Sequence, residues 1–295
     1  MDTLRETNLF LSTTFVNDGL QLTKALELCK NSNLRFVELG SNHCYSSTFD
    51  LDVKNYNFIY LVHNYFPIPK IPFVLNIASL NENIFRRSIT HIFNAIDFCD
   101  RIGAKLYTFH PGFLSDPIGS NSSTKNLDFQ WGNKSPNKTN YDIAYENMLR
   151  GIYQCAGYAQ KKNVKIAIET EGSFNKNQFL LMQKPEEYER FFKEFNPSDI
   201  GINLNIGHLN LASHAFHFNT DDFVNIIADY IVAMELSHND GYEDQHLPLL
   251  NDAWYWTIIF DNRFIDSYKI LEFRNTSFEM IEDNIKLFNE KFHAI

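Results

Sequence analysis

Short apolar runs rich in β-branched and aromatic residues alternate along the chain with longer segments whose apolar residues recur at helical spacing. Eight of the short runs have the length and composition of strands. They are Leu9–Phe15, Arg35–Leu39, Phe58–His63, Lys105–His110, Val164–Thr170, Ile200–Asn205, Ile231–His238 and Tyr268–Phe273.

The segments between these runs predict helices. The clearest helical patterns are Gly19–Lys30, Asn83–Ile102, Tyr141–Lys162, Lys184–Phe195, Thr220–Asp229 and Ser277–His293, and Cys44–Asn57 carries a weaker one. Repeated strand–helix alternation predicts a parallel sheet. Because eight strands fall within 295 residues, we expect an α/β protein with one (β/α)8 barrel, a TIM barrel, as a single domain over residues 1–295.

One segment interrupts the alternation. Residues 115–140 are polar and rich in turn-forming residues, and they follow the fourth predicted strand. Loops of this length often carry function. The segment would therefore lie over the active face of a barrel, as a lid anchored by Trp131 or as a loop without a role.

Composition limits the classes of binding partner and the cellular location that we expect. The formal net charge is −10 and no run of Lys or Arg occurs, which argues against a nucleic-acid partner. The chain begins without an apolar signal segment, and no apolar run is long enough to cross a membrane. We therefore expect a cytoplasmic protein with no membrane partner. The sequence leaves the oligomeric state open, and a homodimer paired through barrel helices is one arrangement that it allows.

Polar residues recur where the predicted strands end. In a barrel these ends meet at one mouth, where active sites are found. Burying several ionisable groups together is costly unless they are paired or bind a cation. A mixture of imidazoles and carboxylates suits zinc, manganese, iron or cobalt. The polar strand ends and the residues just beyond them are His63, His110, Glu169, Asn205, His208, His238, Asp244, His246, Glu272 and Arg274.

Several stretches resemble the xylose-isomerase-like superfamily, which includes sugar isomerases, sugar epimerases and endonuclease IV. The resemblance runs from about Leu34 to Arg274 and is carried by Thr108–Gly112, Ala167–Gly172, Ile206–His208, His238–Gly241, Asp244–Leu249 and Asn76–Ser79. It implies that Glu169 and Glu272 bind a metal ion and move protons. It also implies that His238 is a metal ligand and that His208 contacts substrate or metal.

The resemblance extends to a larger set of ligands. His63, His110, Asp244 and His246 are similar to the additional ligands with which endonuclease IV holds three zinc ions. Asn205 departs from the family pattern, which usually has Asp there. Its neutral amide oxygen can still coordinate a metal, but one negative charge is lost. The number of metal ions is therefore open.

These residues support three functions. The first is a metal-dependent isomerase or epimerase acting on a sugar or sugar phosphate through an enediolate, with Glu169 and Glu272 as acid and base. Arg274 would bind a substrate carboxylate or phosphate, or neutralise nearby acids. Glu38 would face the substrate, or simply be polar. The alternatives are a zinc phosphodiesterase that cuts abasic DNA, and a barrel that has lost catalysis, which Asn205 motivates.

Overall fold

The computed structural model describes residues 8–16, 19–32, 34–118, 130–131, 138–175 and 179–294. Eight parallel strands form a closed barrel in the order β1-β10-β9-β8-β7-β4-β3-β2. The strands are β1 (Leu9–Ser12), β2 (Phe36–Leu39), β3 (Ile59–His63), β4 (Leu106–Phe109), β7 (Lys165–Glu169), β8 (Gly201–Asn205), β9 (Ile231–Leu236) and β10 (Tyr268–Leu271). All eight predicted strands and the TIM barrel are confirmed.

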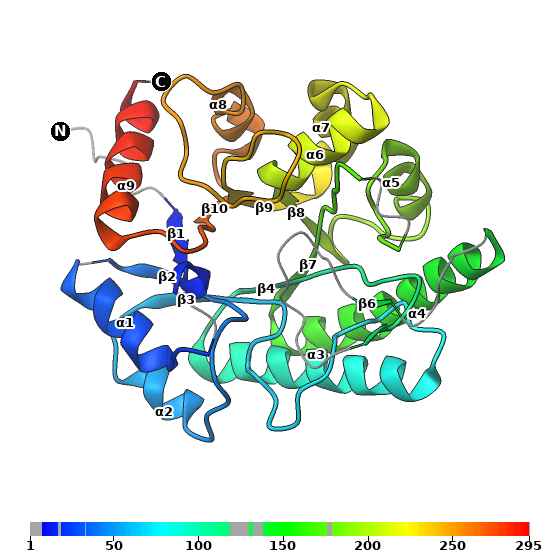
Figure 1. Ribbon diagram of the computed structural model, residues 1–295. Helices are drawn as coiled ribbons and strands as arrows, with labels where there is room; N and C mark the ends of the chain where they lie inside the picture. Colours follow the sequence, from blue (N-terminus) through cyan, green and yellow to red (C-terminus); the bar gives the residue numbers. More distant parts are fainter. Residues whose placement is uncertain are drawn as a thin grey trace.

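Helices surround the strands (Figure 1). They are α1 (Leu22–Asn31), α2 (Phe49–Lys54), α3 (Glu82–Ile102), α4 (Lys138–Lys162), α5 (Pro185–Phe191), α6 (Ile206–Phe216), α7 (Thr220–Ile227), α8 (Trp256–Ile259) and α9 (Phe278–His293). The helices α6 and α8 were not predicted. No helix in the described part of the chain is both long enough and apolar enough to cross a membrane.

The two ends of the chain close the barrel. The first strand pairs with the last, with Phe10 opposite Ile270. The rings of Phe15 and Phe278 pack edge to face at 5.5 Å, which brings α9 against the chain that follows β1. The barrel therefore needs both ends of the described chain to complete its sheet.

The inside of the barrel has an apolar layer and, above it, a polar one. Phe10, Leu61, Leu106, Ala167, Ala233 and Ile270 form one buried cluster inside the ring of strands. Because side chains alternate along a strand, residues two positions further on face the same interior. Those residues are Ser12, His63, Thr108, Glu169, Glu235 and Glu272, and all six are buried. The apolar layer supports a polar layer at the carboxyl ends of the strands.

The predicted loop over residues 115–140 is described only in part. Pro117–Ile118 (β5) pairs antiparallel with Gln130–Trp131 (β6), and α4 begins at Lys138. Residues 119–129 and 132–137 lie outside the described residues. A lid anchored by Trp131 remains a prediction.

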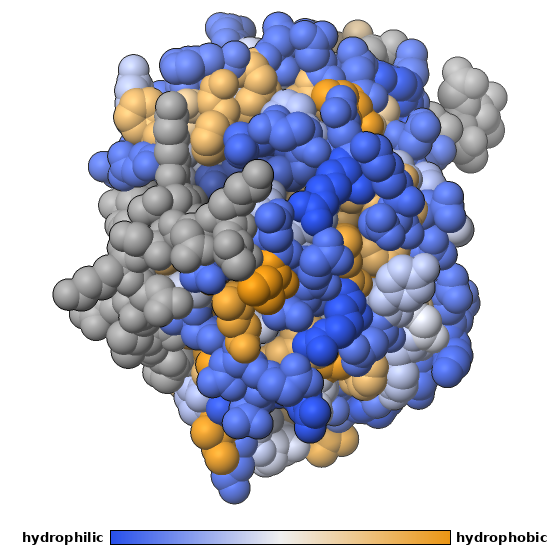
Figure 2. All heavy atoms as spheres, turned by 90° about the vertical axis from the view of Figure 1, so that its right-hand side faces the viewer, coloured by the Kyte–Doolittle hydropathy of each residue, from blue (hydrophilic) through white to orange (hydrophobic). Residues whose placement is uncertain are grey.

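One face of the molecule, over α4 and α5, is drawn in Figure 2. Its described side chains are mostly hydrophilic, and apolar side chains occur there in small separate groups. A large apolar patch would suggest a protein or membrane contact. The described part of this face gives no such indication.

Candidate metal centre

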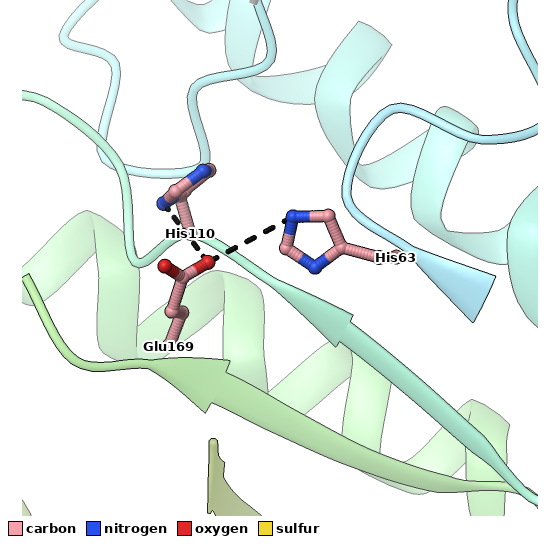
Figure 3. A group of neighbouring side chains, drawn as sticks. All are labelled: His63, His110 and Glu169. Carbon is pink, nitrogen blue, oxygen red and sulfur yellow. Dashed lines mark ion pairs between the residues drawn. The ribbon is translucent and has the colours of Figure 1, made fainter. Parts of the chain in front are cut away.

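The first group of ionisable side chains joins the ends of β3, β4 and β7. His63 Nε2 lies 3.8 Å and His110 Nδ1 lies 3.5 Å from the same oxygen of Glu169, Oε2. Figure 3 shows both rings directed at this carboxylate. Within the described residues, Glu169 Oε2 is buried and has no hydrogen-bond partner. Two imidazoles and a carboxylate oxygen without a hydrogen bond form a donor set that suits a transition-metal ion.

Burial and mutual attraction set the charges in this first group. Burial alone would lower the pKa of His110, but Glu169 and Glu171 outweigh it and raise the pKa to about 9. His110 Nδ1 lies 2.7 Å from Glu171 Oε1. Burial would raise the pKa of Glu169, yet the surrounding histidines hold it well below the usual value. Glu169 is therefore an ionised carboxylate at the centre of a ring of imidazoles.

The second group lies above β8 and in the loop that follows β9. His246 Nε2 is 3.0 Å and His208 Nε2 is 3.7 Å from Asp244 Oδ2. These three residues each offer a ligand atom within 4.8 Å of the others. Burial would raise the pKa of Asp244, but the two histidines lower it well below the usual value. A second set of buried ligands therefore exists beside the first.

His208 connects the two groups. It is buried in the first turn of α6, and its Nδ1 lies 3.2 Å from Glu169 Oε1 and 2.8 Å from the carbonyl oxygen of Thr170. Gly172 allows this approach, because a Cβ at residue 172 would lie 2.0 Å from the carbonyl oxygen of His208. The glycine that follows the strand-end motif is therefore required for the position of His208.

Asn205 is a bridge between carboxylates in this structure. Its Oδ1 accepts the backbone N–H of His208 and so caps α6, as asparagine does well. The amide nitrogen therefore points the other way, and it donates to Glu169 Oε1 at 2.8 Å and to Glu235 Oε2 at 3.0 Å. An NH2 group cannot coordinate a cation. In this arrangement Asn205 joins two acidic side chains, and its predicted role as a ligand would fall to Oδ1, the atom that also accepts the N–H of His208.

The sequence reasoning missed Glu235 on β9 and proposed His238, which lies two residues past the end of that strand, as the ligand. Glu235 is two residues after inward-facing Ala233, so it faces the barrel interior. His238 is only partly buried, its backbone pairs with Leu247, and its ring lies 6.1 Å from that of Tyr255. His238 is outside the three groups of neighbouring ligands found among the described residues. The alternation of the strand was the signal that could have identified Glu235.

A third group of candidate ligands contains Glu38, His63 and Glu235. His63 Nδ1 is 3.3 Å from Glu235 Oε1. Burial and the nearby charge of Glu272 raise the pKa of Glu38 to about 8. Burial and the charge of Glu169 likewise raise the pKa of Glu235 well above its usual value. These raised pKa values show that too few positive groups surround Glu38 and Glu235 to stabilise their ionised forms.

The remaining predicted residues lie on the β10 side of the mouth. Glu272 Oε2 is 3.0 Å from His246 Nδ1. Burial would raise the pKa of Glu272, but His246 outweighs it and brings the pKa to about 2. Arg274 reaches toward Asp244, with 3.9 Å between Nη1 and Oδ2, and its side chain is 26% exposed. Arg274 is thus placed at the edge of the second group, where a substrate could reach it.

The chain is similar in sequence to proteins from Methanocaldococcus jannaschii and Aquifex aeolicus. A protein of Methanocaldococcus jannaschii named MJ1614 is 24% identical over 285 residues, which cover 92% of this chain and 95% of that protein. A shorter match, 34% identical over 71 residues, joins 23% of this chain to 25% of a protein from Aquifex aeolicus named probable endonuclease 4.

Solved structures show the same barrel. The crystal structure of a D-tagatose 3-epimerase-like protein superposes with a TM-score of 0.71 at 18% identity, over 97% of each chain. The family model described as the xylose isomerase-like TIM barrel matches residues 24–286. The chain therefore belongs to the xylose isomerase-like TIM-barrel family, which includes relatives of sugar epimerases and of endonuclease IV.

Proposed function

We propose that the protein is a divalent-metal-dependent isomerase or epimerase of a sugar or sugar phosphate. The observation that carries this proposal is the placement of Glu169 and Glu272. Both carboxylates are buried in the polar layer, on β7 and β10, which are three steps apart in the ring of eight strands. Two carboxylates that point into one barrel interior from well-separated strands can act on opposite faces of a small substrate bound between them.

The two glutamates can exchange a proton with carbon. The charges around each one hold its pKa below the usual value, so both are available as bases. In epimerisation one glutamate, ionised, would remove the proton from the carbon next to a carbonyl group, and the other would have to enter the step protonated so that it can give its proton to the opposite face. In isomerisation the first glutamate would return the proton it has taken to the neighbouring carbon. General acid–base catalysis of this kind contributes about 10² to 10⁴ in rate. A bound divalent ion would supply Lewis-acid stabilisation of the negative oxygen.

The charge of the site favours a substrate rich in hydroxyl groups. Six carboxylates line the polar layer and the loops above it, namely Glu38, Glu169, Glu171, Glu235, Asp244 and Glu272. Arg274 reaches this set as a cation, and His110 is cationic there too when no metal is bound, because the carboxylates raise its pKa to about 9. With the histidines neutral as metal ligands, two divalent ions and Arg274 would offset five of the six formal negative charges, so the site would stay slightly acidic. Sugar hydroxyls can donate hydrogen bonds to such carboxylates, and the guanidinium group of Arg274 would bind the phosphate of a sugar phosphate.

A second function, hydrolysis of a phosphodiester, is favoured by a different observation. The groups around His110 and around His246 lie on either side of Glu169 and provide histidine ligands beyond what one metal ion needs. Sites with two metal ions are common in enzymes that cleave phosphodiesters. The match to the protein named probable endonuclease 4 points the same way over a short stretch. The acidic site and the formal net charge of −10 make DNA a poor electrostatic match.

One experiment separates the two functions. The purified protein, loaded with Mn²⁺, Zn²⁺ or Co²⁺, is offered a panel of ketoses, aldoses and their phosphates, and separately an oligonucleotide with one abasic site. We expect a new sugar isomer with at least one substrate, and its loss in Glu169→Gln. Cleavage of the oligonucleotide without sugar conversion would contradict the isomerase proposal and support the second function.

A further inference from the structure

The carboxyl group of Glu38 is buried in the barrel interior with only weak compensation. Its side chain on β2 is 0% exposed, its oxygens have no well-formed hydrogen bond among the described residues, and the contact with the Ser12 hydroxyl, which lowers its pKa, is outweighed by burial and by the charge of Glu272. A buried carboxylate without compensation costs several kcal/mol, so such groups are found paired or bound to cations. The proposed acid–base reaction does not use Glu38. Its position therefore calls for a ligand.

The neighbours of Glu38 are themselves ligands. Glu38, His63 and Glu235 come from β2, β3 and β9, and each offers one atom within 4.8 Å of the other two. All three side chains are buried. Two carboxylates and an imidazole form a donor set of the kind that binds manganese, iron, cobalt or zinc.

Asparagine side chains hold Glu235 in place for this role. Asn203 Nδ2 donates to Glu235 Oε1 at 2.6 Å, and Asn205 Nδ2 donates to Oε2 at 3.0 Å. Hydrogen bonds from neighbouring side chains to a ligating carboxylate fix its orientation and are typical of metal sites. Glu235 is therefore oriented toward the barrel interior before any cation arrives.

The imidazole of His63 separates this group from the one around His110. Its Nε2 faces Glu169, at 3.8 Å from Oε2, whereas its Nδ1 faces Glu235, at 3.3 Å from Oε1. The hydroxyl of Thr108 lies 2.8 Å from the same Nδ1 and can turn as donor or acceptor. The two groups thus use opposite edges of one ring, so they are two positions.

We propose that Glu38, Glu235 and His63 Nδ1 bind a divalent cation inside the barrel, beneath the mouth. We call this position the inner cation site. It shares His63 with the group that contains His110, through the other ring nitrogen, and it shares no residue with the group that contains His246. It includes none of the residues proposed as acid or base. It does not depend on the reaction that the protein catalyses. A cation there would stabilise the barrel interior and offset the charge of the carboxylates above it.

The test is a count of bound ions. Metal-free protein is equilibrated with excess Mn²⁺, passed through a desalting column, and analysed for manganese per chain by mass spectrometry. Wild type is compared with Glu38→Gln, which keeps the size of the side chain, and with Glu243→Gln, which removes one charge from an exposed residue of the mouth. His208→Gln removes a ligand of another group.

We expect Glu38→Gln to bind one ion fewer than wild type, and Glu243→Gln to match wild type. His208→Gln should lose a different ion, so that the double variant loses both. Glu38→Asp should keep the ion with an affinity weaker by about tenfold or more, because the shorter side chain withdraws the oxygen. This variant decides the question if Glu38→Gln fails to fold.

The proposal is overturned if Glu38→Gln, folded as judged by circular dichroism, binds as many ions as wild type with the same affinity. It is also overturned if Glu38→Gln and His208→Gln lose the same ion, or if wild type binds none. Since the readout is metal content alone, the failure of every sugar substrate would leave the inner cation site standing, and the reverse also holds.

Discussion

The substitution Asn205→Asp tests how the acidic layer is held together without metal. The amide nitrogen of Asn205 donates to Glu169 and to Glu235. Aspartate still accepts the N–H of His208 and caps α6 equally well, so the helix start is preserved. What changes is that a carboxylate oxygen replaces the NH2 group that joins the two acidic side chains.

The cost follows from those two contacts. The hydrogen bond to ionised Glu169 contributes about 1.5 to 3 kcal/mol, and the one to Glu235, whose raised pKa favours the neutral form, contributes about 0.5 to 1.5 kcal/mol, so losing both removes about 2 to 4.5 kcal/mol. Repulsion between the new carboxylate and its neighbours adds to this, although protonation of one of them would relieve part of it. For a chain of this size each kcal/mol lowers Tm by about 2 °C, which gives a decrease of about 4 to 9 °C.

The assay is thermal unfolding in EDTA and in Mn²⁺, followed by circular dichroism. We expect Asn205→Asp to lose this stability in EDTA and to regain much of it in Mn²⁺, because a cation can replace the lost donor. Asn81→Asp is the matched control, since Asn81 caps α3 through its Oδ1 and is exposed. A Tm of Asn205→Asp within about 1 °C of wild type in EDTA would refute the bridging role of Asn205.

Three further predictions concern other parts of the chain. Glu169→Gln and Glu272→Gln should each lower kcat by about 10² or more with little change in fold, measured on the active sugar; a loss below about tenfold would exclude a direct role in proton transfer. Burial lowers the pKa of His91 to about 4, so the folded protein keeps this side chain neutral. Its contribution to the free energy of unfolding is therefore complete above pH 6.5 and is lost as the pH falls toward 4. Urea unfolding should show about 2 kcal/mol less stability at pH 5 than at pH 7 from this residue, and an equal pH dependence in His91→Gln would contradict the assignment. Gly172→Ala should lower Tm and weaken metal binding, because its Cβ would displace the backbone of His208; unchanged metal affinity would show that His208 tolerates the shift.

The sequence predicted the barrel because each strand and most helices leave a local pattern. The strand ends brought His63, His110 and Glu169 to one mouth, as expected from parallel strands. The prediction that His238 is a ligand depended on where β9 ends. The strand stops at Leu236, and side-chain alternation selects Glu235. Reading that alternation from Ala233 would have found it.

The remaining site features depend on three-dimensional contacts. The start of α6 at Asn205 commits the amide oxygen to a helix cap, and this choice turns the nitrogen toward Glu169. The weak compensation of the Glu38 carboxyl group depends on the side chains that pack around it in the folded barrel, and no local sequence pattern predicts those neighbours. The resemblance to a family supplied candidate residues, and the geometry assigned their partners.

The most direct test of the proposed isomerase is solvent isotope exchange. The metal-loaded protein is incubated in D2O with the sugar panel, and the sugars are examined by NMR. We expect deuterium at one carbon next to the carbonyl group of at least one sugar, at a rate that falls in both Glu169→Gln and Glu272→Gln. A product isomer formed without deuterium, or exchange that persists in both variants, would contradict proton transfer by these two glutamates.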